Sequence, residues 1–343
     1  MATTKEIKNR INGVKDTQKI TNAMYLIAST KLRKAKSELD STRPYFQALQ
    51  NEIKRIFRIK EEIENKYFYP ITGEHVLPGS YGYLVITADK GLAGAYNQNV
   101  IKEAVKLMKE HENPKLFVVG EYGRHYFTSH HIPIEKSFLY TAQNPTIHRA
   151  REISGILLDM FDRGELSKIF VIYTDMKSAV NSQTCTTRLL PFHRAQFIVP
   201  DSHEKEIKSA FEFMPSLETI LDSIVPSYVT GFIYSALIDS FCSEQNARMS
   251  AMDSANQNAQ KLLDELSVQY NHIRQSAITQ EITEISSGAK SMKRKAEKRR
   301  GELQKAEIEK AELQRAELQK AKMQRAELQE TELRSAKGGA APQ

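Results

Sequence analysis

The sequence predicts an α/β protein in which both ends of the chain pair as a long antiparallel two-helix coiled coil, and the middle forms a Rossmann-like domain with a mostly parallel sheet. Residues 217–288 have the pattern of one helix of about 100 Å, too long for a compact domain of this size to enclose. A matching apolar pattern opens the chain. Between the two, short apolar runs alternate with helical stretches, which is typical of a parallel sheet covered on both faces.

The first helix is expected over residues 3–58. Its start places the Thr3 hydroxyl three residues before the Glu6 carboxylate, as in a capping box. Pro44 should bend this helix, because it removes one backbone hydrogen bond. Apolar residues at alternating spacings of three and four form a narrow seam that needs a partner helix. This seam contains Ile7, Ile11, Val14, Tyr25, Ala28, Leu32, Ala35, Leu39, Phe46, Leu49, Ile53 and Ile56.

Basic residues are concentrated at the start of this helix. Residues 1–36 contain nine Lys or Arg, against Glu6 and Asp16. Two interpretations stay open, a solvated helix face and a surface for an acidic partner. The second interpretation rests on Lys8, Lys15, Lys19, Lys31, Arg33 and Lys34, which cluster at one end of the expected rod.

The second helix carries its own seam, and a globular segment between the two helices makes them antiparallel. If Ile56 lies near Leu217, residue 3 faces about residue 269, and everything after about residue 272 is unpaired. The segment beyond is apolar and slim, which suggests that another protein surrounds it: Ala277, Ile278, Ile282, Ile285 and Gly288. The second seam contains Ile238, Cys242, Met249, Met252, Ala259, Leu263, Leu266, Tyr270, Ile273 and Ala277.

The middle of the chain has the pattern of a separate domain. A hinge rich in charge, Pro and Gly precedes it. Three apolar runs of strand type, at residues 83–87, 116–119 and 169–173, alternate with helical stretches at residues 97–111, 120–129 and 146–163. Residues 183–190 alternate more and are expected to form an outer strand. The expected divisions are therefore 1–58, 59–80, 81–215, 216–288 and 289–343.

The first expected strand leads into a glycine-bearing turn, Asp89-Lys-Gly-Leu-Ala-Gly-Ala-Tyr-Asn97, before a helix. Doubly wound domains hold phosphates at this position, so a nucleotide site is one interpretation. The turn lacks the three-glycine dinucleotide pattern and the Gly-Lys-Ser/Thr ending of a phosphate loop. A purely structural turn is therefore the favoured interpretation.

Other chemistry is scarce in the sequence. His125, His130 and His131 have no carboxylate or cysteine at ligand spacing, and no nucleophile elbow occurs, so we expect no metal, no cofactor and no catalytic residue. Cys185 and Cys242 match no metal or redox spacing and are expected to be buried thiols. No run approaches 18 apolar residues, so a soluble chain is expected. A net charge of +7 is weak evidence for nucleic acid.

Past Gly288 the sequence changes. Residues 290–300 are strongly basic, and a five-residue repeat of the form Ala-Glu-Leu-Gln-Lys follows. Each residue type is a good helix former, yet a period of five turns through about 500°, so the leucines form no stripe. A charged single helix or a fluctuating coil is expected; a pentapeptide β-helix is a weaker alternative.

Three segments of the first helix resemble the γ subunits of rotary ATP synthases: Lys5-Glu-Ile-Lys-Asn-Arg-Ile11, Thr17-Gln-Lys-Ile-Thr-Asn-Ala-Met24 and Lys31-Leu-Arg-Lys-Ala35. The second helix agrees through Ser243-Glu-Gln-Asn-Ala-Arg-Met249 and through residues 270–285. The glycine turn also matches, although Ala93 replaces a frequent cysteine. The resemblance covers residues 1 to about 288.

This resemblance implies a rotor in a proton- or sodium-translocating ATP synthase. Its partners would be the α and β subunits, the ε subunit and the membrane c-ring, at the cytoplasmic face of a bacterial inner membrane. It implies no nucleic acid and no catalytic site in this chain, and the absence of a regulatory cysteine pair implies no thiol switch. The implied subunit contacts are Lys19, Met24, Arg248, Arg274, Gln275, Thr279 and Glu281.

Three other interpretations are distinguishable. A coiled-coil scaffold with an α/β head would not require α and β subunits. An enzyme using the glycine turn would bind nucleotide as an isolated chain. A basic coiled coil on nucleic acid would show steep salt dependence.

Overall fold

A computed structural model describes residues 3–59, 65–69, 79–139, 141–176, 182–193, 214 and 216–337. Most of the expected hinge at 59–80 therefore lies outside the described residues. The chain divides into two compact units. One contains residues 11–264, and the other contains residues 1–10 and 265–343; each is described by itself.

Two long helices form the ends of the chain. Helix α1 spans Thr4–Ile59 and contains Pro44, and helix α5 spans Leu217–Lys337 and contains Pro226. Thr3 caps α1 as expected, since its backbone N–H donates to Glu6 Oε2 at 2.8 Å and its hydroxyl accepts from the Glu6 N–H. Helix α5 does not end at Gly288 but continues through the five-residue repeats.

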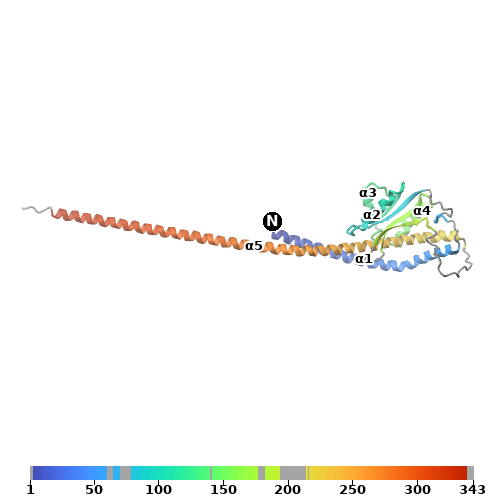
Figure 1. The fold of residues 1–343 in the computed structure, drawn as a ribbon, viewed down its shortest axis with the longest axis horizontal. Helices are drawn as coiled ribbons and strands as arrows, with labels where there is room; N and C mark the ends of the chain where they lie inside the picture. The colour runs from blue at the N-terminus through green and yellow to red at the C-terminus, as the bar shows by residue number, and fades with distance from the viewer. Residues whose placement is uncertain are drawn as a thin grey trace, which may run out of the picture. The chain divides into compact units, whose positions relative to one another are not determined.

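Within residues 11–264, α1 and α5 lie side by side and antiparallel, as expected (Figure 1). Gln18 Nε2 donates to Gln260 Oε1 at 3.3 Å, and the Thr21 hydroxyl donates to the Asn256 side chain. The expected register was wrong by five or six residues, since it placed Gln18 near residue 254. The expected register places Ile56 near Leu217, at the end of the helix pair, whereas α1 continues to Ile59.

Half of the seam residues are buried, and the others are half-buried apart from one. Within residues 11–264 the buried seam residues are Ala28, Ala35, Leu39, Ile53, Ile56, Ile238, Cys242, Met252 and Leu263. In the other unit, Ile7 and Leu266 are buried, whereas Ala277 is exposed. The residues of the two predicted seams are therefore turned away from solvent within each unit, apart from Ala277.

The middle of the chain forms a five-stranded sheet in the order β3-β2-β1-β4-β5. Strands β1 to β4 are parallel, and β5 pairs antiparallel with β4 at the edge. The expected strands and the outer strand are present, and the sequence pattern missed only the short β3. The strands are β1 (Ser80–Ile86), β2 (Lys115–Val119), β3 (Lys136–Phe138), β4 (Leu166–Met176) and β5 (Ser182–Leu190).

Helices cover both faces of the sheet (Figure 1). Helices α2 (Tyr96–Met108) and α3 (Glu121–Ser129) pack on one face, through a core that includes Tyr83 and Val85. Helix α4 (Ile147–Asp162) and the long helices pack on the other, through a core that includes Leu84 and Ile86. Alternate residues of β1 thus belong to opposite cores, as expected for a sheet buried on both sides.

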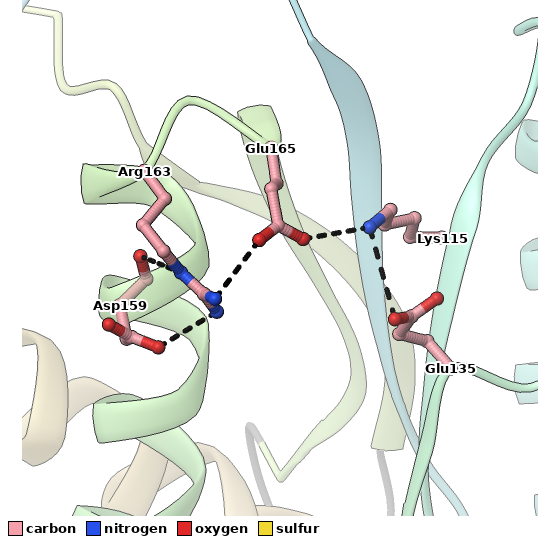
Figure 2. A network of polar contacts seen from close by, with 5 residues as sticks. All are labelled: Lys115, Glu135, Asp159, Arg163 and Glu165. Carbon is pink, nitrogen blue, oxygen red and sulfur yellow. Dashed lines mark hydrogen bonds and ion pairs between the residues drawn. The ribbon is translucent and has the colours of Figure 1, made fainter.

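A network of ion pairs lies at the end of the sheet where strands β2 and β4 begin (Figure 2). Lys115 Nζ lies 3.1 Å from Glu165 Oε2 and 3.8 Å from Glu135 Oε1. Arg163 bridges Glu165 Oε1 at 3.3 Å and Asp159 Oδ2 at 2.8 Å. The network therefore joins α4, the start of β4, β2 and the loop before β3.

One stretch of α5 is long and apolar enough to cross a membrane by length and composition, and 44% of it is buried within the protein. The core helix of a soluble protein has the same properties, so this is weak evidence for a membrane span.

Candidate functional site

The candidate site is the place where α5 crosses the carboxyl ends of β1 and β4. Strands β2 and β3 lie on one side of β1, and β4 lies on the other, so the connections change direction between β1 and β4. In doubly wound folds the crevice at such a switch point holds ligands. The glycine turn follows β1 at this point and leads into α2.

The glycine turn is held by its own side chains. Asp89 Oδ1 accepts from the Glu121 N–H at 2.9 Å, at the start of α3. The buried Asn97 side chain accepts from the Ala88 N–H at 2.9 Å. Leu92 has φ of 61°, in the left-handed region that non-glycine residues rarely adopt. Its side chain is 64% exposed at the tip of the turn.

Arg248 of α5 connects the long helix to this turn. One guanidinium nitrogen, Nη1, lies 2.6 Å from Glu244 Oε1, one helical turn earlier. The other, Nη2, donates to Gly91 O at 3.0 Å and to Lys90 O at 3.4 Å. Arg248 is only 8% exposed, so the charge is buried together with its partner. A buried ion pair is stable only when its geometry is good and its remaining hydrogen-bonding atoms also have partners.

Burial raises the pKa of Glu244, and the nearby Asp89 carboxylate raises it further, whereas Arg248 opposes both effects. Arg248 therefore stabilises the ionised Glu244 that the pair requires. Removing either partner would leave an uncompensated buried group, which is costly.

Two serines of α5 form hydrogen bonds with backbone groups at the end of β4. Strand β1 pairs with β4 only as far as Val85 and Ile172, so the backbone of Thr174 extends past its neighbour. The Thr174 N–H donates to Ser240 Oγ at 3.2 Å, and Ser243 Oγ donates to Thr174 O at 3.3 Å. These hydroxyls replace the hydrogen bonds that another strand would supply.

Tyr96, the first residue of α2, closes the crevice from the other side. It is buried in a small cluster with Ala88 and Ala93, against which Ala247 of α5 packs. Burial raises the pKa of Tyr96, whose hydroxyl hydrogen-bonds to Ser240. Contacts from α5 therefore reach β4, the glycine turn and α2.

A cavity of about 190 Å³ lies beside Arg248, between α1, α5 and the turn. Met24, Ile27 and Lys31 of α1 line it together with Asp89 and Lys90. In the described part of the chain, Asp89 Oδ2 is one of three buried side-chain nitrogen or oxygen atoms without a hydrogen-bond partner. Two of the expected contact residues, Met24 and Arg248, thus line one cavity.

The other expected contact residues are on the surface. Lys19 is exposed and lies 3.1 Å from Asp16. In the unit that contains residues 265–343, Arg274, Gln275, Thr279 and Glu281 are exposed, and the Thr279 hydroxyl donates to Gln275 O at 2.9 Å. Ile282 and Ile285 of the apolar segment are 62% and 73% exposed.

The other candidate groups do not form a catalytic arrangement. No cluster of three His, Cys, Asp or Glu side chains that could hold a metal occurs among the described residues. His130 Nδ1 lies 2.8 Å from Tyr126 O, and the two rings stack. Cys242 is buried, as expected, and burial raises its pKa to about 12. Cys185 is only half-buried, so the expectation of burial was wrong for it, because β5 is an edge strand.

Sequence reasoning missed Ser240, Ser243 and Glu244 as residues of this junction. For Ser243 and Glu244 the available signal was the run of polar residues at 243–246, which follows the seam residue Cys242. A polar run that is buried needs hydrogen-bond partners, and these are supplied by the turn and by β4.

Comparison with known proteins gives a consistent match. A sequence model described as ATP synthase matches residues 3–292. The ATP synthase gamma chain of Acetivibrio thermocellus is 39% identical over 297 residues, which cover 85% of this chain and 100% of the relative. The sodium ion specific ATP synthase gamma chain of Acetobacterium woodii is 36% identical over 300 residues, 84% of this chain and 98% of the relative.

Solved structures share the fold. A chain of the Euglena gracilis mitochondrial ATP synthase, from a structure of its OSCP, F1 and c-ring in rotational state 3, has a TM-score of 0.61 at 17% identity. The match covers 84% of this chain and 94% of that one. A chain of the Tetrahymena thermophila central stalk and c-ring has a TM-score of 0.52 at 24% identity, over 69% of this chain and 99% of that one.

Proposed function

Because the chain belongs to the ATP synthase gamma chain family, we propose that it is the central-stalk rotor of a proton- or sodium-translocating ATP synthase. It couples rotation of a membrane c-ring to conformational change in catalytic β subunits. One observation carries this proposal: the similarity to a gamma chain extends over the whole length of that relative, through both long helices and the sheet domain.

The proposed partners are the α and β subunits, the ε subunit and the c-ring. The coiled coil of α1 and α5 enters the bore of the hexamer of α and β subunits, and the sheet domain at 81–215 rests on the c-ring. The complex then holds this chain as a peripheral subunit at the cytoplasmic face of a bacterial inner membrane. Exposed apolar residues at 278–285 support a surrounding protein, since single exposed side chains are ordinary but a row of them on one segment is not.

Rotation acts through differential contact. An asymmetric shaft presents a different face to each of three equivalent β subunits and biases each toward an open or a closed state. Exposed charges such as Lys19 can guide the contact, although screening limits each exposed pair to about 1 kcal/mol. Shape and stiffness therefore contribute more than any single charge.

The proposed contact residues fall in two groups. Lys19 and Met24 meet an acidic surface of β, with Arg248 alongside. Because the Arg248 guanidinium is buried against Glu244 and the turn, it contributes through the surface that it supports rather than by reaching the partner. The second group hydrogen-bonds to loops of β and α: Arg274, Gln275, Thr279 and Glu281.

The chain itself contributes no catalytic residue to ATP hydrolysis in this proposal. Helix α5 crosses the place where a doubly wound domain would bind nucleotide, and its side chains bind the glycine turn and the end of β4 there, which supports this assignment. Nucleotide chemistry then belongs to the α and β subunits. The isolated chain is expected to bind no ATP in a calorimetric titration, and measurable binding would favour the enzyme interpretation.

The segment after residue 292 extends past the family match. Residues 293–337 are part of α5, and four of the leucines there are exposed: Leu303, Leu313, Leu318 and Leu328. We expect residues 289–343 to act as a separate extension that leaves the hexamer through its crown and slows rotation. Deleting residues 290–343 tests this: a higher ATPase rate with unchanged assembly is expected, and an unaltered rate would remove this role.

Co-expression with α and β subunits tests the proposed function. The complex should elute as one stoichiometric species on size exclusion and hydrolyse ATP in a manner that depends on this chain. A chain that elutes alone, or as a homodimer, would favour the coiled-coil scaffold instead.

A further inference from the structure

The chain's own helix α5 crosses the crevice at the switch point between β1 and β4 and binds the backbone on its sides. Ser240 and Ser243 bind the end of β4, Ala247 packs on Tyr96, and Arg248 binds the glycine turn. All these contacts come from one segment of α5, residues 240–248. The segment binds Thr174 at the end of β4 and the carbonyls of Lys90 and Gly91 in the glycine turn, on two sides of the crevice where doubly wound folds bind ligands.

We propose that residues 240–248 of α5 act as a permanent internal ligand of the sheet domain, and that Arg248 is the positioning residue that holds the glycine turn across the crevice. The contacts of Arg248 with the carbonyls of Lys90 and Gly91 are called the pin below. The pin fixes the sheet domain to the helix that carries it. This inference deepens the proposed function, on which its consequence for coupling rests, whereas the pin itself is a property of the isolated chain.

The geometry of Arg248 explains why an arginine is needed. The planar guanidinium donates in two directions at once, to the Glu244 carboxylate and to the carbonyls of Lys90 and Gly91. A lysine supplies a point charge without this fixed fork. Glu244 orients the guanidinium, and the carbonyl of Gly91 receives the shorter of the two turn contacts.

The residue after that carbonyl shows what the pin accomplishes. Leu92 has a left-handed φ, which costs a non-glycine residue free energy and persists only where the surroundings enforce it. Arg248 holds the Gly91 carbonyl on one side of Leu92, and buried Ala93 anchors the other. The exposed tip, Lys90 to Leu92, is therefore held in one orientation instead of sampling several.

Hydrogen exchange on the full-length chain tests the pin. Arg248→Gln should accelerate exchange of the amides in a peptide covering residues 88–97 by about tenfold, since it removes hydrogen bonds to a charged donor. A peptide covering β2 should be unchanged. The exchange rate of this peptide in Arg248→Lys should lie between those in Arg248→Gln and in the wild type. Glu244→Gln should accelerate exchange in the same peptide by a smaller factor than Arg248→Gln.

Lys261→Gln is the matched control, because Lys261 is an exposed cation on the same helix, away from the turn. It should leave the exchange of residues 88–97 unchanged. If the turn in Arg248→Gln is as protected as in the wild type, or if Lys261→Gln loosens it equally, the pin is refuted. Should Arg248→Gln fail to fold, Glu244→Gln tests the same contact, and wild-type protection of the turn in that variant would refute the pin.

A second readout separates the pin from the proposed function. In the complex with α and β subunits and the membrane sector, Arg248→Gln should lower ATP-driven ion pumping more than ATP hydrolysis, and Arg248→Lys should restore part of the pumping. A loosened turn in a chain that never joins the complex would refute the proposed function and leave the pin intact. Wild-type pumping with an unchanged turn would refute the pin alone.

Discussion

Gly231 of α5 is where the close approach of the two long helices depends on a missing side chain. Three atoms of the Phe46 ring, including Cγ, lie within 3.0 Å of the position that an alanine Cβ would take. Real Cβ atoms essentially never make such contacts, and because Cγ is among the three atoms, the whole ring must move. Phe46 is also held by Tyr45 and Tyr234, whose ring centroids lie 5.3 Å and 6.2 Å away.

The net effect of Gly231→Ala follows from two opposing terms. Alanine in a helix interior is favoured over glycine by about 1 kcal/mol. Forcing an extra methyl group into a packed contact costs about 1–3 kcal/mol. We therefore expect Gly231→Ala to lower the free energy of unfolding by up to about 2 kcal/mol, which corresponds to a decrease in Tm of up to roughly 6 °C for a chain of this size.

Gly155 in α4 provides the matched control, because no atom lies within 4 Å of its would-be Cβ. Gly155→Ala should stabilise the chain by about 1 kcal/mol. Denaturant unfolding followed by circular dichroism measures both variants. The double variant Phe46→Ala/Gly231→Ala completes the test, since the added methyl group at position 231 should be favourable once the ring is gone. If Gly231→Ala stabilises the chain as Gly155→Ala does, the helix packing described above is refuted.

Three further outcomes are expected. Burial and the neighbouring Asp175 raise the pKa of Asp239 to about 6, against the opposing effect of Arg43, so its ionisation weakens the fold as pH rises from about 4 to about 6. Asp239→Asn should stabilise the chain by up to about 3 kcal/mol at pH 7 and by nothing below about pH 4, measured by chemical unfolding across pH; equal effects at both pH values would contradict this. Met24→Lys adds a cation beside Lys31 and Lys90, and should impair ATP-driven pumping in the complex; unchanged pumping would exclude the predicted contact. Glu165→Gln breaks the network of Figure 2 and should cost about 1 kcal/mol in low salt and less in high salt, measured by thermal unfolding; a salt-independent loss would contradict an ionic cause.

The helices and most of the sheet could be predicted because their signals are periodic. All the seam residues except Ala277 are buried or half-buried, and the apolar runs of β1, β2 and β4 form central strands. Strand β3 was not predicted because it has only three residues, Lys136–Phe138, which form no apolar run. The register of α1 against α5 was not predicted because a seam with a near-regular repeat is compatible with several offsets.

The site was harder to predict than the fold. The glycine turn was found from its glycines, and its structural interpretation agrees with the bonds made by Asp89 and Asn97. The resemblance to the γ subunits implied that Arg248 lies beside a partner surface, and a buried arginine is rare. Its role became visible only when the fold brought the turn, 157 residues away in sequence, within hydrogen-bond distance. Periodicity contains no information about such long-range polar contacts.

Rotation of this chain inside a complex tests the central proposal most directly. The complex with α and β subunits is immobilised through β, and a bead is attached to the sheet domain. We expect one copy of this chain in each complex and rotation of the bead in one direction while ATP is hydrolysed. Sustained ATP hydrolysis with a stationary bead, or a complex that forms and turns over without this chain, would contradict it.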